Sequence, residues 1–157
     1  MILKNYTLKI GLYQPTVNYT ICCSLIIPKS QFYLPAFFYH CYSLERIDLT
    51  GMDTSSAGSM AYMFAGCGTL ANLDLKGVNT SGVTDMSCMF LACSDLTSLD
   101  LSSFDTAQAE MDDMFAYCSS LRQVTVGNQW QTESGRGGDE LFPGCEQPVT
   151  VSAKEPE

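Results

Sequence analysis

The chain has 157 residues, 46% of them hydrophobic, and a formal net charge of −9 from 17 acidic and 8 basic residues. A chain of this length and composition buries a core, which excludes wholesale disorder. The acidic balance argues against nucleic acid or an anionic membrane as a partner, because both attract basic surfaces.

The N-terminal residues 1–21 do not share the pattern of the rest of the chain. Two short apolar segments, LKIGL and VNYTI, flank the turn-prone YQPT. They favour a pair of strands that caps the exposed end of the following structure. This stretch lacks the long apolar core of a signal peptide. Nowhere does an apolar run approach the roughly 18 residues of a membrane span, so we expect no membrane insertion.

Residues 22–145 are organised by an internal repeat. Its clearest markers are five cysteines at intervals of 26, 26, 25 and 27 residues, namely Cys41, Cys67, Cys93, Cys118 and Cys145. The copies are regular over 41–118 and degenerate over 119–145. A period of this length predicts one supersecondary unit per repeat, stacked on its neighbours. Residues 146–157 then form a tail.

Each repeat contains the pattern LxxLxL, as in Leu70, Leu73 and Leu75. Its last two apolar positions alternate with polar ones, which predicts a short strand with one buried face. A turn-prone Asp-Thr or Asn-Thr pair follows at 53–54, 79–80 and 105–106.

The second half of each repeat has a helical period. Apolar residues recur at i, i+3, i+4 and i+7 in three copies, namely Met60, Met63, Phe64, Cys67, Met86, Met89, Phe90, Cys93, Met111, Met114, Phe115 and Cys118. This spacing predicts a short helix with one buried face. The expected fold class is therefore an α/β repeat: a leucine-rich-repeat-like solenoid with one short strand and one short helix per repeat, and parallel strands stacked on one face.

The segment VTDMSCMFLACSDLTSLDLSSFDT at 83–106 resembles the repeat of the BspA-like, or DUF285, class of bacterial surface proteins. Upstream, IIPKSQFYLPAFFYHCYSL at 26–44 resembles the shorter sister repeat of the same class. The resemblance implies a leucine-rich-repeat-like solenoid that is secreted or held at the bacterial cell surface. It also implies adhesion to proteins of a host or of neighbouring cells.

The cysteines permit several interpretations. We expect no metal site, because the chain has no CxxC pair and a single histidine, His40. The five periodic cysteines share a face with Phe64, Phe90 and Phe115, which favours buried thiols that act as small apolar fillers. Disulfides remain an alternative. Three cysteines lie off this ladder and are the better candidates for an exposed or paired thiol: Cys22, Cys23 and Cys88.

Polar residues in LxxLxL face outward and form a stripe across the predicted strands. The stripe comprises Arg46, Asp48, Asn72, Asp74, Lys76, Ser98, Asp100 and Gln123. Asp48, Asp74 and Asp100 occupy the same position in three repeats, where like charges on neighbouring strands repel. One explanation is local, with basic side chains and hydroxyls solvating the carboxylates. The other is that the stripe binds a cation or a basic segment of a partner.

These patterns predict a non-catalytic binding or adhesion module that recognises a protein ligand through its strand face and needs no cofactor. The alternative is a structural spacer, or a fragment of a larger surface protein with recognition elsewhere. A third possibility is an enzyme that uses Cys88 or Cys22 as its nucleophile.

Overall fold

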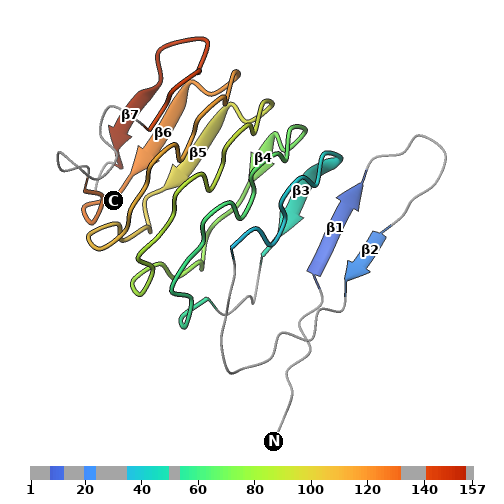
Figure 1. Cartoon of the computed structure of the whole chain (residues 1–157), viewed down its shortest axis with the longest axis horizontal. Coiled ribbons are helices and arrows are strands. Elements are labelled where there is room, and N and C mark those ends of the chain that lie inside the picture. The colour runs from blue at the N-terminus through green and yellow to red at the C-terminus, as the bar shows by residue number, and fades with distance from the viewer. Residues whose placement is uncertain (1–7, 13–19, 24–34, 50–53, 132–140, 155–157) are drawn as a thin grey trace, which may run out of the picture.

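The computed structural model describes residues 8–12, 20–23, 35–49, 54–131 and 141–154. The repeats stack side by side in chain order, with their strands along one side of the stack (Figure 1). Seven strands occur in the described residues: β1 (Leu8–Leu12), β2 (Thr20–Cys23), β3 (Leu44–Asp48), β4 (Asn72–Leu73), β5 (Ser98–Leu101), β6 (Gln123–Val126) and β7 (Thr150–Ala153).

The strands form two sheets, with the orders β2-β1-β3-β4 and β5-β6-β7. β3 and β4 pair in parallel, as do β5, β6 and β7, whereas β1 runs antiparallel to β2 and to β3. The predicted single stack of parallel strands is therefore wrong, because no ladder joins β4 to β5. The antiparallel strands β1 and β2 lie at the N-terminal end, where the sequence predicts a separate pair of capping strands.

The short helix predicted in each repeat is also wrong, because the described residues contain no helix. The segments 60–67, 86–93 and 111–118 are runs of turns. Every second backbone N–H in 60–67 and 86–93 donates to the next repeat, as in Phe64 to the Met89 carbonyl (2.9 Å), and Phe115 and Tyr117 do the same in the third segment. The N–H groups between them reach only three residues back, as in Cys67 to Phe64 (3.0 Å). An α-helix needs each N–H to reach the carbonyl four residues back, so the predicted α/β leucine-rich-repeat-like solenoid does not form.

Left-handed backbone conformations recur four residues apart in these turn segments. The pairs, with their φ values, are Tyr62 (59°) and Gly66 (76°), Cys88 (56°) and Ala92 (56°), and Asp113 (57°) and Tyr117 (59°). Such a conformation costs a non-glycine residue about 1–2 kcal/mol, and it interrupts a right-handed helix. The hydrogen bonds to the neighbouring repeat offset this cost.

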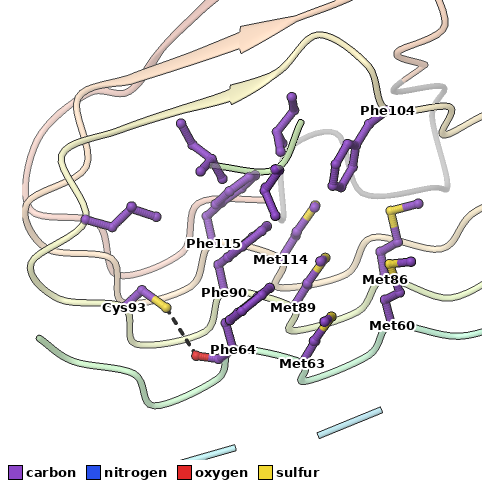
Figure 2. Close-up of a cluster of buried hydrophobic side chains, with 14 of the residues drawn as sticks. Met60, Met63, Phe64, Met86, Met89, Phe90, Cys93, Phe104, Met114 and Phe115 are labelled. Atoms are coloured by element: carbon purple, nitrogen blue, oxygen red, sulfur yellow. Dashed lines mark hydrogen bonds between the residues drawn. The ribbon is translucent and has the colours of Figure 1, made fainter. Parts of the chain in front are cut away.

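A column of stacked phenylalanine rings runs through the core (Figure 2). Phe38, Phe64, Phe90, Phe115 and Phe142 follow one another with ring centroids 5.2 to 5.6 Å apart. Rows of methionines from successive repeats lie beside the rings. The i, i+3, i+4, i+7 spacing therefore brings its residues inward, although a run of turns carries them instead of a helix.

Buried threonines follow the strand segment in three repeats and form hydrogen bonds with the next repeat. Thr54, Thr80 and Thr106 are each only 2% exposed. The Thr80 hydroxyl donates to the Asp105 carbonyl (3.2 Å) and accepts from the Asp105 N–H (2.8 Å). Thr54 and Thr106 bond to the following repeat in the same way. The turn-prone Asn-Thr and Asp-Thr pairs thus join neighbouring repeats as well as turning the chain.

Close contacts between side chains and glycines mark the second left-handed position of the turn segments. A Cβ at Gly66 would collide with the ring of His40 in the preceding repeat, and one at Gly144 would collide with Tyr117. Ala92 occupies the same position with a φ of 56°. Alanine can therefore occupy this conformation at a cost, and the His40 ring is a second, steric reason for glycine at residue 66.

We predict that Gly66→Ala lowers the free energy of unfolding by about 1–3 kcal/mol, as overpacking does. The loss should be smaller in a His40→Ala background, because the colliding ring is gone and only the cost of the left-handed conformation remains. Gly68→Ala is the matched control, since nothing lies within 4 Å of its added Cβ. Chemical denaturation of the four variants of the cycle measures this coupling. Equal losses with and without His40 would contradict it.

Candidate binding groove on the strand face

A groove of about 830 Å³ lies on the outward face of β3, β4 and β5. The backbone register brings its side chains together, because Arg46 pairs with Asn72 across β3 and β4. Its lining comprises Glu45, Arg46, Ile47, Thr69, Ala71, Asn72, Leu73, Asp74, Lys76, Asp95, Ser98 and Asp100. Most of these side chains are polar, which distinguishes the groove from the buried side of the same strands.

The groove includes six of the eight residues of the predicted stripe: Arg46, Asn72, Asp74, Lys76, Ser98 and Asp100. Gln123 pairs with Ser98 across β5 and β6 but does not line the groove. Asp48 ends β3, and its side chain lies outside the described residues.

Sequence reasoning missed the residues that precede the stripe in each repeat. Glu45 and Ala71 occupy the first variable position of LxxLxL, and Thr69 and Asp95 lie just before that pattern. These positions recur with the same period as the stripe. The repeat pattern could therefore have identified these positions as neighbours of the stripe.

Two of the stripe aspartates, Asp74 and Asp100, have a local structural role. The Asp74 carboxylate accepts the N–H of Lys76 (3.0 Å), and the Asp100 carboxylate accepts the N–H of Ser102 (2.9 Å). These are Asx turns, in which the side chain bonds to the backbone two residues on. Asn79 forms the same turn with Ser81 (3.0 Å). An asparagine can therefore replace the aspartate in such a turn without its charge.

The groove carries more negative than positive charge. It holds the carboxylates of Glu45, Asp74, Asp95 and Asp100 and the cations of Arg46 and Lys76, listed together with the rest of the lining. The hydroxyl and backbone N–H of Ser102 lower the pKa of Asp100, and the charges of Lys154 and Lys76 act in the same direction. Asp100 is therefore ionised at neutral pH and remains exposed to solvent.

The periodic cysteines form a ladder of hydrogen bonds within the core. The thiols of Cys67, Cys93, Cys118 and Cys145 each donate to the carbonyl of a phenylalanine in the preceding repeat, as Cys93 does to Phe64 (3.3 Å; Figure 2). The equivalent bonds join Cys67 to Phe38 (3.1 Å), Cys118 to Phe90 (3.0 Å) and Cys145 to Phe115 (3.3 Å). The thiols thus fill space and also satisfy carbonyl oxygens.

Burial makes these thiols poor nucleophiles. It raises the pKa of Cys67 and of Cys118 to about 12, and it raises the pKa of Cys93 further. The backbone N–H of the preceding ladder cysteine offsets only part of this effect.

Cys88 lies apart from the ladder but is also buried, at 9% exposed. Burial raises the pKa of Cys88, and a hydrogen bond with Tyr62 only partly counteracts this. Cys22 and Cys23 belong to β2, and the structure does not describe their side chains.

Within the part of the chain that the structure describes, no cluster of three or more His, Cys, Asp or Glu could hold a metal ion. The same part has no helix long and apolar enough to cross a membrane.

We predict that the ladder thiols make stability fall at alkaline pH. Thiols of the unfolded chain lose their protons near pH 9, whereas Cys67 and Cys118 keep theirs to about pH 12 in the folded protein. Their contribution is fully present below pH 9. It is lost as pH rises towards the folded values, by at most about 1.4 kcal/mol per thiol and pH unit.

Denaturation curves at increasing pH would test this against the Cys67→Ala/Cys118→Ala variant. Wild type should lose more stability than the variant, because tyrosines and lysines titrate in both proteins. Parallel pH profiles would contradict the prediction.

A family model described as "Mycoplasma protein of unknown function, DUF285" matches residues 33–151. The match covers most of the chain, including every residue that lines the groove. No curated protein and no solved structure matches the chain.

Proposed function

Since the chain belongs to the DUF285 family, we propose that it is a non-catalytic binding module of a bacterial cell surface. It recognises a protein ligand through the groove on β3, β4 and β5. The observation that carries this proposal is the groove itself, where exposed polar side chains from three successive repeats converge. Repeat scaffolds commonly present such extended surfaces to partners.

The character of the groove favours a protein over a small molecule. Small-molecule sites are usually concave, mostly apolar and enclosed. Here Arg46, Asp74, Lys76 and Asp100 are all exposed and project from the strand face. Polar and charged groups of both signs suit the hydrogen-bonded rim and the electrostatic complementarity of a protein interface.

A non-catalytic role is consistent with the state of the reactive groups. Nucleophilic catalysis requires an accessible group of lowered pKa or an adjacent base. Cys88 has the opposite properties, since it is buried and its pKa is raised. His40 stacks on Tyr39, with ring centroids 3.8 Å apart.

The spacer function remains the second candidate, and one observation favours it. Asp74 and Asp100 each close an Asx turn, so the repeat needs them for local structure whether or not a partner binds. In that case the strand face would bind nothing, and the array would separate other parts of a surface protein.

The double variant Asp74→Asn/Asp100→Asn separates these two roles. Asparagine retains the oxygen that accepts the turn hydrogen bond, as Asn79 does. It removes the charge and replaces the second carboxylate oxygen by an amide group. We expect a melting temperature close to that of wild type, but at least about tenfold weaker retention of surface proteins from host or neighbouring cells on the immobilised protein. Quantitative mass spectrometry of the retained proteins measures this.

The matched control is Asp85→Asn/Asp105→Asn. These aspartates close the same turn, with Ser87 and Ala107, but do not line the groove. The control should retain the same proteins as wild type. Retention that is unaffected by the groove variant would exclude the groove as the interface, and failure of wild type to retain any protein would favour the spacer.

A further inference from the structure

The strand side of the C-terminal repeat leaves apolar side chains exposed. β7 is the strand at this end of the stack (Figure 1). Its Val151 pairs with Val124 of β6, which pairs with Leu99 of β5. Leu99 is 3% exposed and Val124 is fully buried, but Val151 is 44% exposed. Ala153, two residues further along the same face of β7, is also exposed. The apolar side of the sheet is therefore uncovered at β7.

The turn side of the same repeat shows the same change. Phe142 stacks on Phe115 with ring centroids 5.3 Å apart, and it is only partly buried, whereas Phe115 is fully buried. Cys145 is likewise less buried than Cys118, its equivalent in the preceding repeat. In the preceding repeats, the following repeat covers these positions. The residues whose cover is incomplete are together called the end face, namely Phe142, Cys145, Val151 and Ala153.

β7 also has an outer edge that no strand accompanies in the described part of the chain. The N–H groups of Thr150 and Lys154 both donate inward, to carbonyls of the preceding repeat (2.9 Å each). Alternate residues of a strand direct their backbone groups to opposite edges, so Val151 and Ala153 direct theirs outward. β7 contains neither a charged residue nor a proline, which are features that keep edge strands from pairing.

A second copy of β7 fits this edge. The edge of a repeat strand already accepts an antiparallel strand in this protein, because β1 pairs antiparallel with β3. When two copies of β7 lie antiparallel about a two-fold axis beside Ser152, Val151 of each copy faces Ala153 of the other. Both outward residues of each copy then exchange backbone hydrogen bonds with the other copy. The same axis brings the two end faces together and covers their apolar side chains.

The N-terminal end of the stack favours this symmetric contact over a head-to-tail chain of copies. At that end β1 and β2 lie beside β3, so no repeat strand is presented to β7 of another copy. A two-fold contact between identical surfaces closes after two copies. The groove on β3, β4 and β5 lies away from β7 and remains free in such a dimer.

We propose that two copies of the chain associate through their end faces, with the β7 strands paired antiparallel about a two-fold axis beside Ser152. This inference is independent of the proposed binding function. It adds that the dimer presents two grooves, and two linked sites bind a surface that carries many ligands more tightly than one site does.

Sedimentation velocity of the full chain under reducing conditions measures the association. We expect a reversible monomer–dimer equilibrium at concentrations between about 1 and 100 µM. Ala153→Pro removes an outward N–H but leaves the inward bonds of β7 intact, so it should weaken dimerisation at least about tenfold. Its melting temperature should match that of wild type at a concentration where both are monomeric.

A second pair of variants tests the side chains of the contact. Val151→Lys places a charge in the end face and should also weaken dimerisation at least about tenfold. Tyr42→Lys is the matched control, because it introduces the same charge at another exposed apolar residue, next to β3. This control should dimerise as wild type does.

A disulfide between the copies locates the two-fold axis. In the proposed pairing, Ser152 lies opposite Ser152 of the other copy as a non-hydrogen-bonded pair, with Cα atoms about 4.5 Å apart, which suits a disulfide. Ser152→Cys should therefore form a covalent dimer under mild oxidation. Thr150→Cys is the control, because residues 150 of the two copies lie on the order of 13 Å apart. It should cross-link no more than wild type.

Sedimentation as a monomer at every concentration would overturn the inference. So would a dimer that withstands both Ala153→Pro and Val151→Lys, since its contact then lies elsewhere on the molecule. Growth beyond a dimer would contradict a closed two-fold contact, and equal cross-linking of Thr150→Cys and Ser152→Cys would exclude the proposed register. Retention of cell-surface proteins on the Val151→Lys variant decides the proposed function separately, because the groove is unchanged in this variant.

Discussion

The structure depends on one arrangement of backbone hydrogen bonds. In each turn segment, alternate N–H groups bond to the next repeat, and those between them bond three residues back. Left-handed residues four positions apart make this alternation possible. Each repeat therefore obtains half of its turn hydrogen bonds from its neighbour, and it cannot form them alone. The phenylalanine column and the thiol ladder lie directly behind these turns, so burial and hydrogen bonding favour the same stacked arrangement.

The period, the family and the inward-facing residues of the repeat could be read from the sequence, but the backbone conformation could not. Met60, Met63, Phe64 and Cys67 have the spacing of a helical face, and they are all buried. A run of turns with a left-handed residue in every fourth place brings the same positions inward. Glycine would reveal those places, but it occurs at only some of them, and Tyr117 takes the same conformation. The helix prediction failed because the residue types in these segments do not indicate which positions have a positive φ.

The sequence also located much of the candidate site while leaving its chemistry open. Alternation in LxxLxL placed Asp74 and Asp100 on the outer face, and both line the groove. Their turn hydrogen bonds could have been anticipated, because an aspartate or asparagine two residues before a free N–H is a recognised turn signal. The missing ladder between β4 and β5 could not be anticipated, because NLDL at 72–75 and SLDL at 98–101 have the same alternation. Only the structure shows that one pair of equivalent strands lacks its ladder.

The central claim is that turns bonded between repeats replace the expected helices, and one measurement tests it directly. Nuclear magnetic resonance detects couplings across a hydrogen bond, from the amide nitrogen of the donor to the carbonyl carbon of the acceptor. The structure places the Phe90 N–H 2.9 Å from the Met114 oxygen, measured between the nitrogen and the oxygen. We predict a coupling from Phe90 to Met114. A coupling from Phe90 to Met86, which an α-helix requires, would contradict the account.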